Sequence, residues 1–390
     1  MSQHVVVVGA GLVGAAAALA LAKHHQVTLI EPLEPAVQKG ALGVDLRNVA
    51  ISPASRNLLN RLGAWNLDQL ATYHKMVVWE QWGTGSVAFE AQEVGLEQMG
   101  WIVEVSGLAR SLWEVCEAHP SVAVQVAKVE KIELMDDTGV TLTLGSGEQV
   151  VADFVVACDG AQSRLRKHLD VAVTERPVDQ VALATVVETE HPHEQTARQR
   201  FLLDGPLALL PSRYPNLCSV VWSQSPAEGK RRLGLDEEQF CAEIGSAIEH
   251  RLGRVVRCDR RVVFPLTQHY MSRSLHAERV LFIGDAAHVL HPLAGLGVNL
   301  GFEDVAGVEQ VAAQHASLNN ASAWNAFVRT RQARANAMVR TLEMFKVLYA
   351  QAGPLTTLAR NLAVDLFDRS GIAKRQVMRE AMGLGPISRV

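Results

Sequence analysis

The 390-residue sequence lacks features that define several protein classes. No stretch approaches the roughly 18 consecutive apolar residues that a membrane-spanning helix needs. No signal peptide is expected, because the apolar run Val5–Val8 is followed at once by glycines. The five cysteines are widely spaced and form no CxxC, which favours reduced thiols in the cytoplasm. A net charge of −4 argues against nucleic acid as a partner, and the length allows two domains.

Signatures of several chemistries are missing as well. There is no GxSxG nucleophile turn. His288 and His291 are accompanied by no HExxH or carboxylate pattern, so no metal site is predicted. The GxGxxG pattern occurs once, which leaves no second dinucleotide fold for a nicotinamide cofactor. A redox enzyme built on this chain would therefore rely on a flavin.

The N-terminal residues are typical of a dinucleotide-binding βαβ unit. Gly9, Gly11 and Gly14 follow an apolar strand directly, and Glu31 ends the next strand. Such glycines allow a tight turn and let a pyrophosphate approach the helix N-terminus, while the acid accepts hydrogen bonds from a ribose. The expected elements are strand His4–Gly9, helix Ala15–His25 and strand Gln26–Ile30.

A second stretch, Arg279–Asp304, predicts a buried strand Val280–Ile283 that leaves Asp285 at its carboxyl end. Helical spacing begins near Leu296, so free backbone N–H groups and the positive end of a dipole would face the preceding segment. An anion or an electron-rich ring would suit that position. The stretch could also be an ordinary strand–turn–helix.

Between these stretches the sequence predicts alternating helices and strands. Ser52–Leu62 and Ser106–Ala118 are expected helices, and strands dominate 181–263 with one helix near 236–250. The remaining expectations are strands Lys75–Gln81, Ser86–Glu90, Val129–Met135, Val140–Leu144 and Gln149–Ala157, helices Asn320–Tyr349 and Leu355–Asp368, and a final turn to about Met382.

Three separated motifs, GAGLVG at Gly9–Gly14, CDGAQSRLR at Cys158–Arg166 and FIGDAAHVLHPLAGLGVNLG at Phe282–Gly301, occur in the order seen in single-component flavin aromatic hydroxylases. The chain resembles this family along nearly its whole length. With DLRNVAIS, GWIVE and GPLALLP it is most similar to the ubiquinone-biosynthesis hydroxylases. Its C-terminal motifs are most similar to the demethoxy-ubiquinol hydroxylase branch.

The resemblance implies an α/β fold: a Rossmann-like FAD-binding domain, an inserted, mostly antiparallel substrate-binding sheet and a helical C-terminal part. The implied limits are 1–71, 97–171 and 269–345 for the FAD domain, 72–96 and 172–268 for the substrate domain, and 346–390 for the C-terminal helices.

The resemblance also implies cofactor contacts. Glycines 9, 11 and 14 would hold the FAD pyrophosphate, Glu31 the ribose and Asp285 the ribityl chain. Asp159 would serve both FAD and a transient NAD(P)H. The remaining implied contacts are Arg47 and Arg110 against the cofactor and Gly297, Val298 and Asn299, whose backbone N–H groups would face the flavin. Two residues depart from the family pattern, Leu296 where glutamine is usual and Val105 where asparagine is usual; both bear on substrate orientation.

The implied reaction is hydroxylation of a prenylated phenol or quinol with NAD(P)H and O2 in ubiquinone biosynthesis. No catalytic base is assigned. Alternatives are a non-catalytic FAD-binding scaffold of the biosynthetic complex and an FAD-dependent isoprenoid reductase. Candidate cavity walls are Leu209, Pro211, Trp222, Phe264 and Leu266, which could equally be core residues.

The C-terminal part is basic. Residues 320–390 hold 11 Lys/Arg and 4 Asp/Glu, and Lys374 and Arg375 lie among apolar positions at helical spacing. These helices either pack on the cofactor domain or on a second subunit of a homo-oligomer, or dock on anionic lipid at the inner face of the membrane. The last alternative would bring the enzyme to a lipid-soluble substrate.

Overall fold

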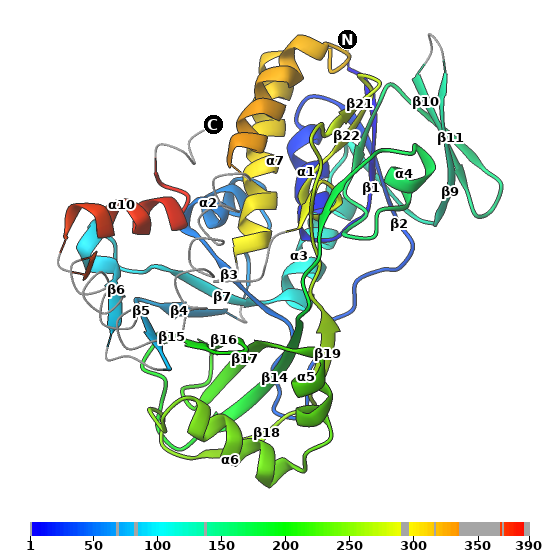
Figure 1. Ribbon diagram of the computed structural model, residues 1–390. Helices are drawn as coiled ribbons and strands as arrows, with labels where there is room; N and C mark the ends of the chain where they lie inside the picture. Colours follow the sequence, from blue (N-terminus) through cyan, green and yellow to red (C-terminus); the bar gives the residue numbers. More distant parts are fainter. Residues whose placement is uncertain are drawn as a thin grey trace.

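The computed structural model describes residues 2–67, 70–81, 85–135, 139–289, 296–315, 317–334, 367–368 and 370–385. Two large sheets dominate it (Figure 1). One contains the N-terminal strand and is covered by long helices. The other lies at the opposite end of the molecule, with helices of its own on its outer face.

The first sheet has six strands in the order β21-β22-β12-β1-β2-β8, parallel except for β21. Their bounds are β1 His4–Val8, β2 Gln26–Glu31, β8 Val122–Val126, β12 Phe154–Ala157, β21 Leu275–His276 and β22 Val280–Phe282. Val5 to Val7 of β1 are fully buried, as expected for a central parallel strand covered on both faces.

The two faces of this sheet carry different layers. On one face, Val5 and Val7 pack with helices α1 (Leu12–Ala22), α3 (Val105–Ala118) and α7 (Leu296–Gln314). On the other, Val6 and Val8 pack with a three-stranded sheet of β9 (Val129–Met135), β10 (Gly139–Leu144) and β11 (Gln149–Ala152). The period-2 alternation of β1 therefore builds two cores from one strand.

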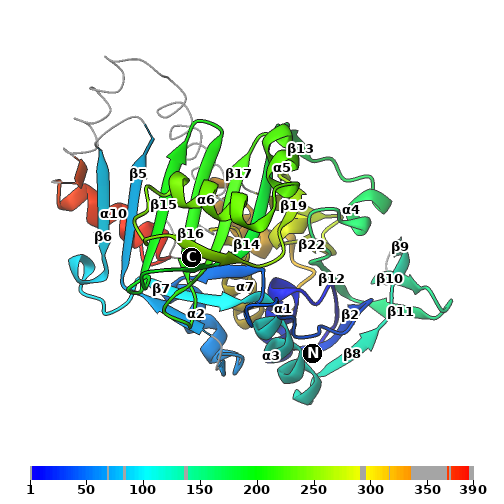
Figure 2. The same ribbon diagram turned by 90° about the horizontal axis from the view of Figure 1, so that it is seen from below.

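The second sheet runs in the order β18-β14-β17-β16-β15-β5-β6, and β19 also pairs with β14 (Figure 2). Helices α5 (Pro226–Leu233) and α6 (Glu237–Ala247) belong to it. Its strands are β5 Lys75–Glu80, β6 Ser86–Glu90, β14 Val181–Thr189, β15 Thr196–Leu202, β16 Gly205–Pro211, β17 Leu217–Gln224, β18 Val255–Cys258 and β19 Val262–Pro265. Pairing is antiparallel except between β5 and β15. We call this the substrate sheet, after the substrate-binding sheet that the sequence resemblance implies.

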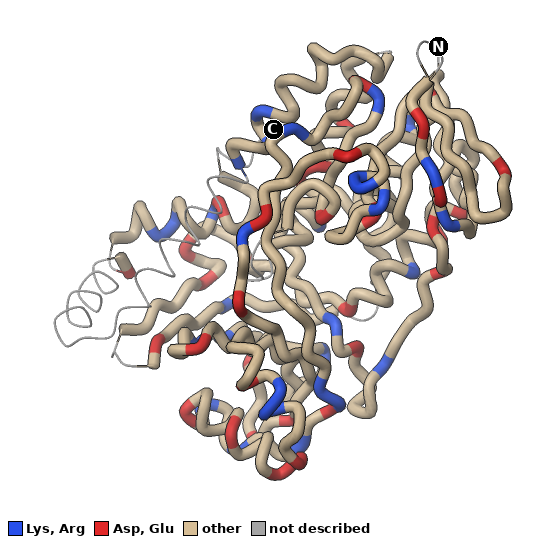
Figure 3. Tube along the Cα trace, turned by 45° about the vertical axis from the view of Figure 1, so that its right-hand side comes forward, with Lys and Arg blue, Asp and Glu red and all other residues tan. Residues whose placement is uncertain are grey.

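A small sheet of β3 (Asn48–Ile51), β7 (Gly100–Glu104) and β4 (Leu70–Tyr73) lies between the two large sheets. Helix α2 (Pro53–Arg61) follows β3, and Ser52 caps it by accepting a hydrogen bond from the Ser55 N–H, as the Ser-Pro start predicts. Lys and Arg are interspersed with Asp and Glu along the described chain (Figure 3).

Three expected elements differ from the structure. The strand expected over Gln149–Ala157 is two strands, because the backbone of Asp153 bonds to His4 and carries the chain from the β9–β11 sheet into the first sheet. The substrate sheet has a second helix, α5, which begins at the Ser225 cap and Pro226. The final turn is a ten-residue helix, α10 (Ile372–Ala381). Most of the helix expected over Leu355–Asp368, and residues 335–349 of the preceding one, lie outside the described residues; 321–334 is helical.

Candidate flavin site

The carboxyl ends of three neighbouring parallel strands meet at one edge of the first sheet. Val8 of β1 pairs with Ala157 of β12, which in turn pairs with Phe282 of β22. The residues that follow these strands, Gly9, Asp159 and Asp285, therefore lie along the same edge. The prediction that the strand at Val280 brings Asp285 beside the other two strand ends is confirmed.

The glycine loop is closely packed on one side and open on the other. A Cβ on Gly14 would lie 1.8 Å from the Gly9 carbonyl oxygen, so only glycine lets the first turn of α1 approach β1 this closely. Gly9 has a φ of 98° and a Cβ there would lie 2.4 Å from the Cys158 carbonyl oxygen. A Cβ on Gly11, the residue before α1, would meet nothing within 4 Å. The N-terminus of α1 thus faces open space.

Glu31 reaches back to this loop. Its Oε2 accepts a hydrogen bond of 2.6 Å from the Ala10 N–H, which fixes a carboxylate beside the helix start. Arg110, on α3, forms ion pairs with Glu34 and with Glu114. Because Glu34 lies just beyond the end of β2, these pairs place Arg110 on the Glu31 side of the edge.

Asp159 and Arg166 organise the middle of the edge. Asp159 Oδ2 accepts from the N–H groups of Arg164 and Leu165, whereas its buried Oδ1 has no hydrogen-bond partner among the described residues. The buried Arg166 donates to the Ala161 carbonyl at 2.8 Å and to the Ala286 carbonyl at 2.7 Å. It ties the Cys158–Arg166 motif to the segment that carries Asp285.

Asp285 is exposed at this edge, within the short helix η2 (Gly284–Ala286). The surrounding protein nevertheless removes part of its water and raises the pKa of Asp285, while the charges of His288 and Arg47 act in the opposite direction. Arg47, just ahead of β3, is thus near enough to Asp285 for their charges to interact.

The N-terminus of α7 is anchored by the Asn299 side chain. Its Oδ1 accepts from the Ser52 N–H (2.9 Å) and from the Ser55 hydroxyl (2.8 Å). Its Nδ2 donates to the Ala50 carbonyl at 2.7 Å. Because these bonds occupy the side chain, any contact between Asn299 and a ligand would have to come from its backbone, as is also expected of Gly297 and Val298. A Cβ on Gly297 would meet nothing within 4 Å.

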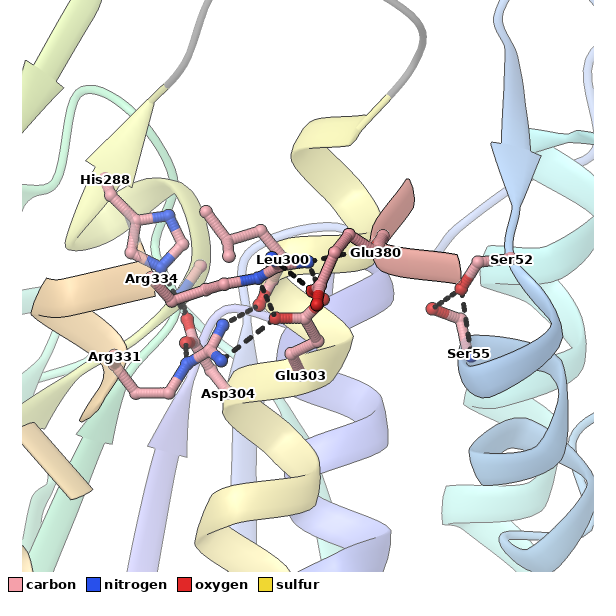
Figure 4. A network of polar contacts seen from close by, with 10 residues as sticks. Ser52, Ser55, His288, Leu300, Glu303, Asp304, Arg331, Arg334 and Glu380 are labelled. Atoms are coloured by element: carbon pink, nitrogen blue, oxygen red, sulfur yellow. Dashed lines mark hydrogen bonds and ion pairs between the residues drawn. The ribbon is translucent and has the colours of Figure 1, made fainter. Parts of the chain in front are cut away.

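A buried network of charges lies behind this edge (Figure 4). At its centre is Asp304 of α7, which is 1% exposed. Its Oδ2 accepts from the Gly284 N–H (2.9 Å) and from His288 Nε2 (2.7 Å). Its Oδ1 accepts from Arg331 Nε at 2.6 Å.

The network extends from Asp304 toward the C-terminal helix. Arg331 also binds Glu303 (3.0 Å) and the Leu300 carbonyl (2.9 Å). Arg334 joins Glu303 to Glu380 of α10. Burial alone would raise the pKa of Asp304, but His288 and Arg331 lower it below its ordinary value. Burial opposes the charged form of His288, yet Asp304 raises its pKa above 6.5.

The substrate sheet presents alternate residues to two environments. Leu209 and Trp222 are buried with Phe240 and Ile244 of α6, on the outer face. Pro211 has the same strand parity as Leu209 and is buried as well. These three are not cavity walls, and their alternative interpretation as core residues is correct. Phe264 is 43% exposed and Leu266 is buried.

The opposite face of the substrate sheet is turned toward the small sheet. Leu210 packs with Ala50 and Ile102 there, and Ser219 accepts a hydrogen bond from Asn48. Ala208, Leu210 and Val221 on this face are partly exposed. Bulky side chains on these strands were expected to line a cavity. Instead, the bulkiest ones fill the core beneath α6, and the alternate residues face the small sheet.

Together these features define a class of protein, a dinucleotide-binding flavoprotein. The open N-terminus at Gly11, the acid at Glu31 and the buried Asp159 Oδ1 suit a group with a pyrophosphate and hydroxyls. FAD carries both.

The comparisons with known proteins agree. Residues 2–342 match the FAD binding domain family. The chain is 35% identical to the 3-demethoxyubiquinol 3-hydroxylase of Escherichia coli strain K12, with 97% of this chain and 98% of that protein covered. It is 33% identical to the ubiquinone hydroxylase UbiL of Rhodospirillum rubrum, covering 98% and 90%. The crystal structure of the p-nitrophenol 4-monooxygenase PnpA from Pseudomonas putida shares the fold, with a TM-score of 0.78, 19% identity and coverage of 100% and 99%.

The chain therefore belongs to the FAD binding domain family and is an FAD-dependent monooxygenase. Several residues that shape the site were not predicted as site residues from the sequence, namely Ser52, Arg166, His288, Asp304 and Arg331. Arg166 belongs to the Cys158–Arg166 motif and Asp304 ends the Arg279–Asp304 stretch. Nothing in their spacing indicates that Arg166 binds two backbone carbonyls or that Asp304 forms a buried ion pair.

Proposed function

We propose that the protein hydroxylates the ring of a polyprenylated phenol or quinol in ubiquinone biosynthesis, using FAD, NAD(P)H and O2. The observation that carries this proposal is the 35% identity to a 3-demethoxyubiquinol 3-hydroxylase over 97% of the chain, since that span includes the substrate sheet as well as the FAD-binding residues. FAD, reduced by NAD(P)H, supplies the oxygen chemistry.

The chain's own residues would bind and orient the cofactor. Gly9, Gly11 and Gly14 would hold the pyrophosphate, and Glu31 would accept hydrogen bonds from the adenosine ribose. Asp285 would hold the ribityl chain. The backbone N–H groups at the start of α7 would donate to the flavin pyrimidine edge and stabilise negative charge there. Further contacts belong to the same proposal: Arg47 and Arg110 at the cofactor, and Asp159 for both FAD and NAD(P)H.

The substrate ring would lie against the face of the substrate sheet that carries Ala208, Leu210 and Val221. Residues 72–96 and 172–268 would then form the substrate domain, which is supported by the pairing of β5 with β15. This face is partly apolar, so it would exclude water from the ring, as an oxygen-transfer site requires.

The deciding experiment measures oxygen uptake and product mass with a short-chain demethoxyquinol and NAD(P)H. A hydroxylase consumes oxygen in a substrate-dependent way and adds one oxygen atom to the ring. A non-catalytic scaffold binds FAD without substrate-stimulated NAD(P)H oxidation, and an isoprenoid reductase forms a saturated product without oxygen uptake. Either of these results would contradict the proposal.

We also propose that the C-terminal part brings the enzyme to an anionic membrane surface. Among the described residues, no helix is both long and apolar enough to cross a bilayer. On α10, Ile372 is 78% exposed, and Arg375 and Arg379 are exposed on the same face. Lys374, expected to face lipid, is instead buried and pairs with Glu93 and Asp368, so it holds α10 on the protein.

Liposome co-sedimentation tests the membrane contact. Binding should need anionic lipid and weaken with salt, and the double change Arg375→Glu with Arg379→Glu should release the protein. Arg254→Glu is the control, because Arg254 is 81% exposed just ahead of β18 and its ion pair with Glu190 is long, at 3.7 Å; this change should leave binding unchanged. Wild-type protein that stays in the supernatant at low salt would refute the contact.

A further inference from the structure

Three side chains of helix α6 and strand β18 bring atoms of the kind that bind metal ions close together. Glu237 and Cys241 lie one turn apart on α6, and Cys258 is the last residue of β18. One carboxylate oxygen and the two sulfur atoms all lie within 4.8 Å of one another. When donor atoms share a metal ion, each lies about 2.0–2.3 Å from the metal, so the distances between the donors are shorter than 4.8 Å. The fold thus brings together ligands that the sequence spacing kept apart.

The contacts around Glu237, Cys241 and Cys258 favour a defined binding site over an accidental proximity of three side chains. Cys241 is 5% exposed, Cys258 is partly exposed and Glu237 is exposed, so the cluster has one buried donor and is open to solvent on the Glu237 side. The Cys258 N–H donates to Glu237 Oε1 at 2.9 Å, which orients the carboxylate. The two thiols are within hydrogen-bonding reach of each other. Such outer contacts position metal ligands in known sites.

We propose that Glu237, Cys241 and Cys258 bind a divalent ion of the Zn²⁺ type, with water as the fourth ligand. Two thiolates select a borderline-soft ion over Mg²⁺ or Ca²⁺, and the carboxylate and water oxygens complete a tetrahedral S2O2 set. Binding replaces both thiol protons, which pass to solvent. Because the thiols must lose these protons to bind the ion, binding becomes tighter as the pH rises.

The metal would have a structural role. Figure 1 shows α6 and β18 at the end of the molecule away from α1 and α7, so the ion would take no part in the flavin chemistry. It would fasten α6 to β18, which is an edge strand of the substrate sheet. Strand edges are where sheets open most readily, and a metal link between α6 and β18 opposes that opening.

The test uses the full-length protein with FAD, stripped of metal by a chelator and kept reduced. Co²⁺ is the probe, because its thiolate complexes absorb in the near ultraviolet and its tetrahedral complexes absorb strongly in the visible. We expect one Co²⁺ per chain, displaced by Zn²⁺, and a melting temperature that rises with Zn²⁺ concentration. Cys241→Ser and Cys258→Ser should each abolish the near-ultraviolet absorption expected for Co²⁺ bound by both thiolates. Glu237→Gln should raise the Kd for Co²⁺ at least about tenfold.

Cys218→Ser is the matched control, because Cys218 is a buried cysteine of the same sheet outside the cluster; its variant should bind Co²⁺ like the wild type. If a serine variant does not retain FAD, the rate of Cys258 alkylation is measured in wild-type protein instead. Zn²⁺ should slow that rate. The proposal is overturned if no thiolate band forms, or if Zn²⁺ leaves alkylation unchanged. It is also overturned if peptide mapping shows that the two cysteines form a disulfide in the protein as isolated.

Discussion

Replacing Asp304 with asparagine removes one charge from the centre of the network behind the flavin site. The carboxylate accepts from three donors, two at Oδ2 and one at Oδ1. An asparagine has one acceptor oxygen, so its NH2 group must face at least one donor. If the NH2 group faces Arg331, which is 5% exposed, the guanidinium loses one of its three acceptors. It keeps Glu303 and the Leu300 carbonyl.

The expected magnitude follows from the burial. Breaking a buried ion pair by removing one partner costs about 3–5 kcal/mol, because the other charge is left without compensation. We expect Asp304→Asn to fall at the lower end of this range, because Glu303 still compensates part of the Arg331 charge. The Gly284 N–H would also lose or weaken its bond, and Gly284 precedes Asp285, so FAD affinity should fall together with stability. Changing Arg331 to glutamine in the same protein should recover part of the loss, because both charges are then gone.

The pH dependence gives a second, independent signature. The pKa of His288 is raised above 6.5 in the folded protein, so its contribution to stability is complete below that pH and is lost as the pH rises through the folded value. Without the Asp304 charge, burial would instead lower the pKa of His288. Stability would then rise with pH only up to about 6.5, the unfolded value, and would stay level above it. The contribution of Asp304 itself, whose pKa is lowered, would be lost only in acid.

Urea unfolding at fixed FAD concentration, repeated from about pH 6 to 9, measures both effects. Glu309→Gln is the matched control, because Glu309 lies on the same helix but pairs with the more exposed Lys23 and Arg61. It should cost no more than about 1 kcal/mol. If Asp304→Asn costs no more than this control and keeps the wild-type pH slope, the network does not stabilise the site as argued.

Three further predictions concern the cofactor loop and the substrate sheet. Gly14→Ala places a Cβ 1.8 Å from a backbone oxygen and should yield protein without FAD absorbance, whereas Gly145→Ala, whose Cβ would lie 3.7 Å from its nearest neighbour, should retain it. Glu31→Gln should raise the Kd for FAD at least about tenfold in fluorescence titrations, because it replaces a charged acceptor. Leu209→Ala should lower the unfolding free energy by about 2–5 kcal/mol, while Val221→Phe should leave it unchanged and raise KM for the quinol in steady-state assays.

The cofactor edge of the fold could be predicted because its signals are local. A run of valines directly before Gly9, and Glu31 at the end of the next strand, specify a βαβ unit within a few dozen residues. Asp285 was placed correctly because parallel strands end at the same edge of a sheet. The Ser225-Pro226 start of α5 was also a local signal, and it was overlooked among the surrounding strands.

The rest depended on contacts between distant segments. In the sequence, Arg331 is one of many basic residues in the C-terminal part. Its role as a buried ion-pair partner depends on its contact with Asp304, which only the fold creates. Leu209 and Leu210 are identical side chains in adjacent positions, so composition cannot tell which one packs in the core beneath α6 and which one faces the small sheet. Likewise, Cys241 and Cys258 become neighbours only because α6 packs on β18.

The order of strands in the first sheet bears on how the protein is made. Strand β12 lies between β1, from the start of the chain, and β22, which the ribosome delivers only after the entire substrate sheet. Until Val280–Phe282 emerge, the nascent chain holds an incomplete sheet whose β12 edge is open to the wrong partner. Asp285 and the α7 N-terminus arrive later still. If these residues hold FAD as proposed, cofactor capture waits for the last stage of synthesis, and a chain stalled earlier exposes an open strand edge that no flavin stabilises.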